Sequence, residues 1–172
     1  MPEFNYDVVG DTRPAEARWA GEVVGYRRFE RTVCVGRGTA RWEAVADAVL
    51  RWQVKVRSGF RVAPVEGDLV ARSGARYELT ASFGPVTVRE PVRVVTVVDQ
   101  PDRCGFSYGT LCGHPVSGEE AFVVHRSPDG RVWLTLRSLT RPADGGWRWA
   151  FPVLLVAQRV YRRRYLRAFG RH

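Results

Sequence analysis

Short runs of β-branched and aromatic residues dominate the middle of the chain, between Phe60 and Thr140. Apolar and polar positions alternate within the runs, as Val132, Leu134 and Leu136 do against their neighbours, and Gly, Pro, Asp and Ser separate one run from the next. This pattern is typical of strands with one buried face that are joined by hairpin turns. It predicts six antiparallel strands, over residues 61–72, 76–83, 86–98, 103–112, 119–126 and 131–140.

A further strand and a helix are predicted before this region. Residues 22–35 alternate in the same way, and Gly36 and Gly38 end that strand. Thr39 follows as a candidate N-cap of an amphipathic helix that ends before Gly59. The apolar residues of this helix recur at the spacing i, i+3, i+4, i+7, and they are Trp42, Val45, Ala46, Val49 and Leu50.

A long helix is predicted at the end of the chain. Pro152 suits its first position, and arginines dominate its far end. Its expected apolar stripe is Val153, Val156, Ala157, Val160 and Tyr161. Because no repeat or linker divides the chain, the sequence predicts one domain over residues 1–172, with an N-terminal arm (1–21) and a core (22–172).

The order of these elements is strand, helix, six strands, long helix. It favours an α+β fold in which a curved antiparallel sheet of about seven strands wraps around the C-terminal helix. This order resembles the helix-grip fold of START-like and pollen-allergen-like proteins. The resemblance implies a pocket between sheet and helix for an apolar or amphipathic ligand, although some members use that space for catalysis, and a fold does not decide between them.

Composition supports a globular protein. The chain has 172 residues, of which 45% are hydrophobic, and its longest uncharged, mostly apolar run, residues 149–157, is far too short to span a bilayer. The first residues lack the pattern of a secretory signal, so a cytoplasmic location is expected. Cys34, Cys104 and Cys112 have no C-x-x-C spacing, which argues against a disulfide framework and a zinc site.

The net charge of +9 raises the question of a nucleic-acid or membrane partner. Only Lys55 among the 27 basic residues is a lysine, and the arginines are scattered along the chain. Their one concentration is a basic patch at the end of the last helix, where the helix dipole favours cations. Its members are Arg162, Arg163, Arg164 and Arg167. A solvated helix end is the favoured interpretation, and nucleic acid is an unlikely partner.

Residues 108–120, Y-G-T-L-C-G-H-P-V-S-G-E-E, contain the densest set of reactive and conformationally special side chains. One interpretation is a rigid hairpin in which a glutamate accepts backbone hydrogen bonds. The other places His114 and one glutamate at the mouth of a pocket, as acid, base or ligand contacts. Tyr108 and Thr110 share a strand face and could add two hydroxyls.

Glu119 and Glu120 are neighbours on a predicted strand, so they cannot both face inward. Glu120 is the better candidate, because it shares a face with Phe122, which has a large apolar area to bury. A buried carboxylate needs a partner. The predicted candidates are Arg28, Arg93 and Arg137.

The stretch F-S-Y-G-T-L-C-G-H-P-V-S-G-E-E-A-F-V-V at 106–124 resembles a domain-of-unknown-function family, number nineteen-ninety, of bacteria and plants. The likeness extends to N-Y-D-V-V-G at 5–10, to Gly25 and Tyr26, to the helix that ends in Leu50-Arg51-Trp52, and to the final arginine-rich helix. The resemblance implies membership and no particular activity.

Three functions follow in order of preference. The first is binding of a small apolar or amphipathic molecule, with Tyr108, Thr110, His114, Glu120, Trp147 and Trp149 as contacts. The second is an enzyme that uses His114, Glu119 or Glu120 as general acid or base, and the third is a basic module for RNA or anionic surfaces. No cofactor is predicted, and no metal site either, because His114 and His125 lack close ligand spacing. The sequence leaves the ligand and the oligomeric state open.

Overall fold

A single antiparallel sheet forms the centre of the molecule. The structure, a computed structural model, describes residues 3–170, apart from the side chains of Phe83 and Trp147. Seven strands pair in the order β1-β7-β6-β5-β4-β3-β2, and each neighbouring pair is antiparallel. Their bounds are β1 (Arg27–Arg37), β2 (Arg61–Pro64), β3 (Arg76–Phe83), β4 (Val86–Asp99), β5 (Arg103–Thr110), β6 (Val116–Arg126) and β7 (Arg131–Pro142).

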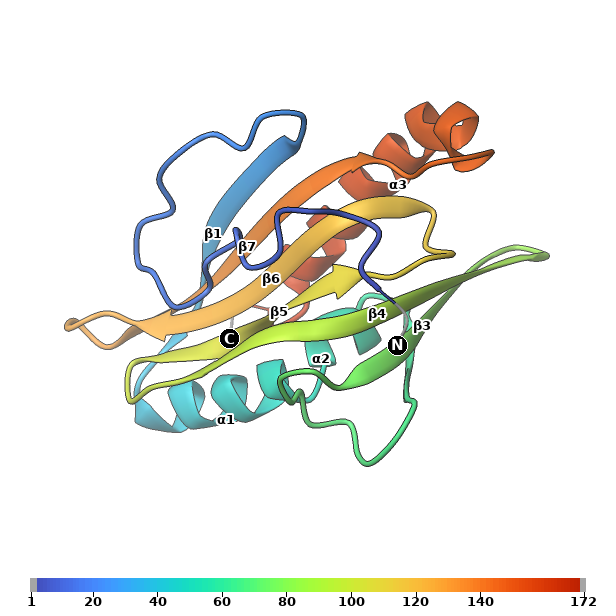
Figure 1. The fold of residues 1–172 in the computed structure, drawn as a ribbon. Coiled ribbons are helices and arrows are strands. Elements are labelled where there is room, and N and C mark those ends of the chain that lie inside the picture. Colours follow the sequence, from blue (N-terminus) through green and yellow to red (C-terminus); the bar gives the residue numbers. More distant parts are fainter. Residues whose placement is uncertain (1–2, 171–172) are drawn as a thin grey trace.

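The helices lie on one side of this sheet. Helix α1 (Thr39–Leu50) and the short α2 (Gln53–Val56) follow β1, and α3 (Trp147–Arg167) follows β7. Figure 1 shows α3 crossing one face of the curved sheet and the N-terminal arm, in blue, crossing the other. The predicted α+β architecture, a curved sheet around a C-terminal helix with a shorter helix after the first strand, is therefore confirmed.

Aromatic rings fill the inner face of the sheet, which is the face that packs against the helices. Trp52 is fully buried, and its ring centroid lies 4.5 Å from that of Phe106 and 4.7 Å from that of Tyr77. Trp52 separates α1 from α2 in a left-handed conformation with φ of 60°, which is uncommon for a bulky residue. This sharp break directs α2 under the sheet and brings Lys55 against the aromatic core.

The outer face is covered by the N-terminal arm. Arg137 on β7 donates hydrogen bonds to the carbonyls of Arg13 at 2.6 Å and Glu16 at 2.9 Å. Arg103 on β5 donates to Pro14 O at 2.7 Å and also to Glu16 O at 2.9 Å. Two arginines from neighbouring parts of the sheet thus satisfy main-chain acceptors of a segment that has almost no secondary structure of its own.

Several predicted boundaries shift. The first strand starts at Arg27, and β2 stops at Pro64 because the chain then forms a loop before β3. β6 starts at Val116, since residues 116–118 continue the ladder with β7. Helix α3 starts at Trp147, so Pro152 lies inside it and not at its first position.

The predicted apolar stripe of α3 is wrong for three of its five residues. Val153, Val156 and Val160 are exposed, whereas Tyr161 is buried and Ala157 half-buried. The inner face of α3 continues with Tyr165, and Phe169 is buried just beyond the helix. The prediction relied on apolar side chains at helical spacing, but large aromatic rings with a polar tip bury more area against this sheet than valines do. Within residues 3–170, no helix is long and apolar enough to cross a membrane.

The close contact between β6 and β7 at Gly118 can be tested by substitution. It has a φ of 150°, and an added Cβ would lie 1.9 Å from the carbonyl oxygen of Leu139. We expect Gly118→Ala to lower the free energy of unfolding by about 3 kcal/mol or more, measured by chemical denaturation. Gly67→Ala is the control, because its φ is similarly positive but nothing lies within 4 Å, and it should cost only about 1 kcal/mol. Equal losses in the two variants would contradict the steric argument.

Candidate functional site

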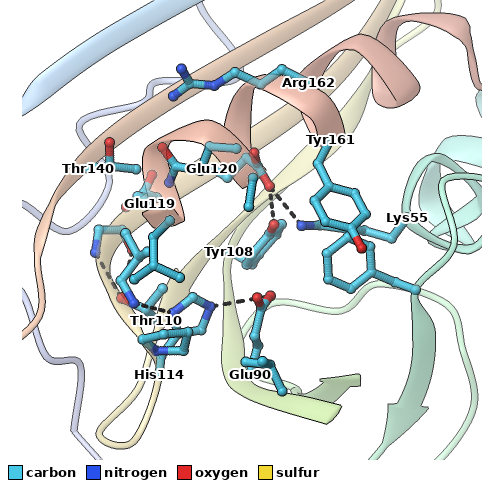
Figure 2. A pocket seen from close by; sticks show the side chains of 18 of the residues that line it. Lys55, Glu90, Tyr108, Thr110, His114, Glu119, Glu120, Thr140, Tyr161 and Arg162 are labelled. Carbon is cyan, nitrogen blue, oxygen red and sulfur yellow. Dashed lines mark hydrogen bonds and ion pairs between the residues drawn. The ribbon is translucent and has the colours of Figure 1, made fainter. Parts of the chain in front are cut away.

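A pocket of about 110 Å³ lies between the inner face of the sheet and helices α2 and α3. Figure 2 shows its polar side chains converging from α2, β4, β5, β6 and α3. Its apolar wall consists of Phe60, Val88, Pro115, Val116, Leu154, Ala157 and Tyr161. Its polar wall consists of Lys55, Glu90, Tyr108, Thr110, His114, Glu120, Thr140, Gln158, Arg162 and Tyr165. More polar side chains thus line the pocket than the sequence predicted, although most of the lining surface is apolar.

Lys55 and Glu120 form an ion pair at the inner end of the pocket. The Lys55 side chain extends from α2, is only 3% exposed, and places Nζ 3.1 Å from Glu120 Oε2. Nζ also donates to the phenol oxygen of Tyr165 at 2.7 Å, and it lies 4.4 Å from the ring centroid of Phe60. The ammonium is therefore stabilised by a carboxylate, a phenol oxygen and aromatic faces instead of water.

Two phenols surround this ion pair. Tyr108, directly opposite Glu120 in the β5–β6 ladder, donates a hydrogen bond to Glu120 Oε2. Burial, followed by the charge of Glu120, raises the pKa of both Tyr108 and Tyr165 well above the usual range. Both phenols therefore stay protonated and can act as hydrogen-bond donors.

His114 and Glu90 form a second pair on the other side of the pocket. His114 Nδ1 accepts a hydrogen bond from the Val116 main-chain N–H at 3.0 Å, which leaves the proton of a neutral ring on Nε2. Nε2 lies 3.5 Å from Glu90 Oε2. Burial would raise the pKa of Glu90, but the charge and hydrogen bond of His114, together with the charge of Lys55, hold it below its usual value. Glu90 is thus held as a carboxylate.

Two polar atoms in the pocket wall have no hydrogen-bond partner among residues 3–170. They are Thr140 Oγ1, on a residue that is 7% exposed, and Gln158 Oε1 on α3. Nearby, Arg162 donates to Ser138 Oγ at 2.9 Å, and its guanidinium lies 4.1 Å from the ring centroid of Phe29. Buried polar atoms are nearly always satisfied in proteins, so these two atoms are available for hydrogen bonds within the pocket.

Glu119 is 1% exposed and serves the opposite face of the sheet. Its carboxylate accepts hydrogen bonds from Tyr6 Oη at 2.9 Å, from Gly10 N at 2.7 Å, and from the Thr12 hydroxyl. The residue borders the pocket, but its carboxylate holds the N-terminal arm. Glu119 is therefore a structural residue and Glu120 the inward one, as the burial of Phe122 favoured.

Three other residues of the 108–120 block also contact the arm. Gly109 leaves room for the ring of Tyr6, whose hydroxyl would lie 2.1 Å from an added Cβ. The Ser117 hydroxyl donates to Asn5 O at 2.6 Å, and the Thr110 hydroxyl donates to the Asn5 side chain and accepts from Gly118 N at 2.8 Å. The hairpin interpretation and the pocket interpretation thus describe the two faces of one block.

The residues predicted as pocket contacts divide into two groups. Tyr108, Thr110, His114 and Glu120 line the pocket. Trp149 does not, because it lies in the first turn of α3 and is 90% exposed. The side chain of Trp147 lies outside the described residues.

The basic patch does not form one surface. Arg162 turns to the pocket and Ser138, and Arg164 donates to the Ser58 carbonyl at 3.4 Å. Arg163 and Arg167 are exposed. Helical spacing distributes these consecutive arginines around α3, so two of the four have contacts inside the protein.

The partner of the inward carboxylate differs from the prediction. Arg28 and Arg93 align with Glu119 across the strand ladders, and Arg137 pairs with Ala121 on the same face, so all three lie on the outer face. Lys55 pairs with Glu120 instead, and Glu90 is a further site residue that sequence reasoning missed. One signal for Lys55 was available, because it is the single lysine in a chain that otherwise uses arginine. Nothing local distinguishes Glu90 from an exposed strand glutamate.

No metal-binding cluster occurs among residues 3–170. In the part of the chain that the structure describes, no three His, Cys, Asp or Glu side chains come close enough together to hold a metal ion. His125 shares the outer face with Glu119, away from His114. The arrangement can instead bind a polar group through several hydrogen-bonding side chains, and it can transfer protons through Glu120, His114 and their partners.

Comparison with known proteins identifies the family. The model of the Domain of unknown function (DUF1990) matches residues 5–168. The chain belongs to this family. A UPF0548 protein of Deinococcus radiodurans is 36% identical over 168 residues, which cover 91% of this chain and 85% of the relative. A UPF0548 protein of Arabidopsis thaliana is 26% identical, over 81% of this chain and 70% of the relative.

Solved structures with a similar fold are more distant in sequence. The protein Ara h 8.0201 has a TM-score of 0.50 at 14% identity and matches over 84% of this chain and 98% of its own. The ginseng major latex-like protein 151 from Panax ginseng has a TM-score of 0.51 at 11% identity, over 81% and 98%. These likenesses establish for this DUF1990 member the helix-grip fold that the order of elements predicted.

The different roles of Glu119 and Glu120 can be tested by a pair of isosteric variants. Glu119→Gln replaces an acceptor of several arm hydrogen bonds, so we expect it to release the arm and lower the free energy of unfolding by about 2–3 kcal/mol. Limited trypsin digestion measures the release as faster cleavage after Arg18. Glu120→Gln should also destabilise the protein, because Lys55 loses its counter-charge, but the arm should stay protected. Equal cleavage of the arm in both variants would contradict this assignment.

Proposed function

We propose that this protein binds a small amphipathic molecule in the pocket between the sheet and α3. Its polar end contacts the Lys55–Glu120 and His114–Glu90 pairs, and its apolar part lies against Val88 and Leu154. The observation that carries the proposal is the pair of unpartnered polar atoms, Thr140 Oγ1 and Gln158 Oε1, in the wall of this pocket. A ligand that hydrogen-bonds to both removes the cost of leaving them unsatisfied.

The size of the pocket restricts the ligand. Its volume of about 110 Å³ is well below the ~300–1,000 Å³ of typical ligand pockets. We therefore propose a compact molecule with a few polar atoms and not a long-chain lipid. The helix-grip fold supports ligand binding only by analogy, so the proposal depends on the residues of this pocket.

Filling the pocket tests the proposal. Native mass spectrometry and solvent extraction of protein from its own host should detect a bound small molecule in the wild type. Ala157→Leu adds bulk to the pocket wall and should remove that molecule, while Val156→Leu, its exposed neighbour on α3, should retain it. A wild-type protein that carries no ligand under gentle conditions, or an Ala157→Leu protein that keeps it, would contradict the proposal.

A second candidate function is general acid–base catalysis in the same pocket. One observation favours it: two ionisable pairs, Lys55–Glu120 and His114–Glu90, line one small cavity. A histidine with its neutral-state proton directed by a hydrogen bond is suited to proton transfer.

Replacement of His114 tests this candidate once a substrate is identified. His114→Gln keeps an acceptor for the Val116 N–H but has no titratable group, so kcat should fall by about 10²–10⁴-fold. The exposed Glu78→Gln is the control for handling and folding. Full activity in both His114→Gln and Glu120→Gln would exclude general acid–base catalysis by these residues.

A further inference from the structure

We propose that Lys55 captures a small aldehyde or ketone as an imine, so that the ligand of this pocket is a carbonyl compound. The proposal rests on the proposed function, since it assigns a chemical class to the molecule that binds there. It gives the Lys55–Glu120 pair a covalent, reversible role in place of a purely electrostatic one.

The choice of lysine at position 55 is the first argument. The chain has 27 basic residues, and only this one is a lysine. An arginine could also pair with Glu120, and its planar guanidinium is in general the better partner for a buried carboxylate. A guanidinium cannot lose its proton in a protein, whereas a lysine amine can do so and become a nucleophile. Nucleophilic chemistry is thus a property that distinguishes Lys55 from every other basic residue of the chain.

The surroundings of Nζ are the second argument. Two of its three N–H donors are directed to Glu120 at 3.1 Å and to Tyr165 at 2.7 Å. No third hydrogen-bond partner occurs among residues 3–170. Lys55 nevertheless borders the pocket, so a small ligand can reach the nitrogen from that side. Figure 2 shows Nζ beside the carboxylate of Glu120 and the phenol of Tyr108.

Lys55, Glu120 and the carbonyl compound account for every proton that is transferred during imine formation. The Lys55 ammonium transfers a proton to Glu120, and the nitrogen lone pair attacks the carbonyl carbon. A C–N bond forms, and the carbonyl π pair moves to oxygen, which takes the proton from Glu120. The nitrogen then returns a proton to Glu120, and Glu120 passes it to the hydroxyl, which leaves as water while C=N forms. The ammonium and the carbonyl compound thus yield a protonated imine and water, without oxidation or reduction.

Tyr108 assists as a positioning residue. Its phenol donates to the same oxygen of Glu120 that faces Nζ, and this fixes the carboxylate in place for each proton transfer. The raised pKa of the phenol keeps that hydrogen bond in place.

Reductive trapping tests the proposal on the full chain. Wild-type protein is incubated with acetaldehyde, butanal or acetone and sodium cyanoborohydride, and adducts are located by intact mass and peptide mapping. Because the chain has a single lysine, the α-amine of the purified protein serves as the internal reference. We expect one adduct at Lys55 that forms at least about tenfold faster than the adduct at the α-amine, owing to acid–base assistance. Labelling of the α-amine alone, with all three probes, would overturn the proposal.

Variants distinguish a site that promotes imine formation at Lys55 from a lysine that is merely accessible to the aldehyde. Lys55→Arg keeps the charge and should lose the internal adduct. Glu120→Gln should slow trapping at Lys55 about tenfold or more, and Glu78→Gln should leave it unchanged. Glu120→Asp, which retracts the carboxylate, replaces Glu120→Gln if that variant does not fold. Trapping that proceeds at the wild-type rate without the Glu120 carboxylate contradicts the proposal.

The experiments distinguish a failure of imine formation from a failure of ligand binding. A bound molecule in native mass spectra, with no adduct at Lys55, leaves the binding function intact and rejects imine formation. A protein that carries no ligand and gives no adduct rejects both. Either outcome is read from wild-type protein and does not depend on the folding of a variant.

Discussion

The alternation of side chains along β6 is the constraint on which the rest of this structure depends. Glu119 and Glu120 are adjacent, so their carboxylates lie on opposite faces of the sheet. Glu119 binds the N-terminal arm on the outer face through Tyr6, Gly10 and Thr12. Glu120 binds Lys55 and Tyr108 on the inner face. A shift of β6 by one residue would turn each carboxylate to the opposite face of the sheet, away from its present partners.

The charged groups on the inner face are not explained by stability. An ion pair such as Lys55–Glu120 gains attraction in a buried site but loses the hydration of both charges. Apolar residues of similar volume often give equal or greater stability at such positions. The inner face already contains a large apolar core around Trp52, so the fold does not need charges there. Together with the atoms of Thr140 and Gln158 that lack a partner among residues 3–170, these charges support the proposed binding of another molecule in the pocket.

Local patterns predicted the parts of the structure that depend on neighbours in sequence. The period of two located the six strands, and the same period selected Glu120 as the inward carboxylate. The partner Lys55 could not be found in this way, because it reaches Glu120 only after α2 packs under the strands. The same holds for Glu90, whose role follows from the register between β4 and β5. The face of α3 was mispredicted in part, since the predicted stripe contained three exposed valines and omitted the buried Tyr165.

The sequence block that identifies the family is mainly a docking site for the arm. Gly109, Ser117 and Glu119 contact Tyr6, Asn5 and Gly10, so the two most recognisable segments of the chain bind each other on the outer face. The inner pocket takes Tyr108, His114 and Glu120 from the same block, but it is completed by Lys55 and Glu90 from elsewhere. The arm packs against β5 and β6, and the same strands carry Tyr108 and Glu120 on the inner face. Arm-binding and pocket-lining residues alternate along the block because neighbouring residues of a strand face opposite sides of the sheet.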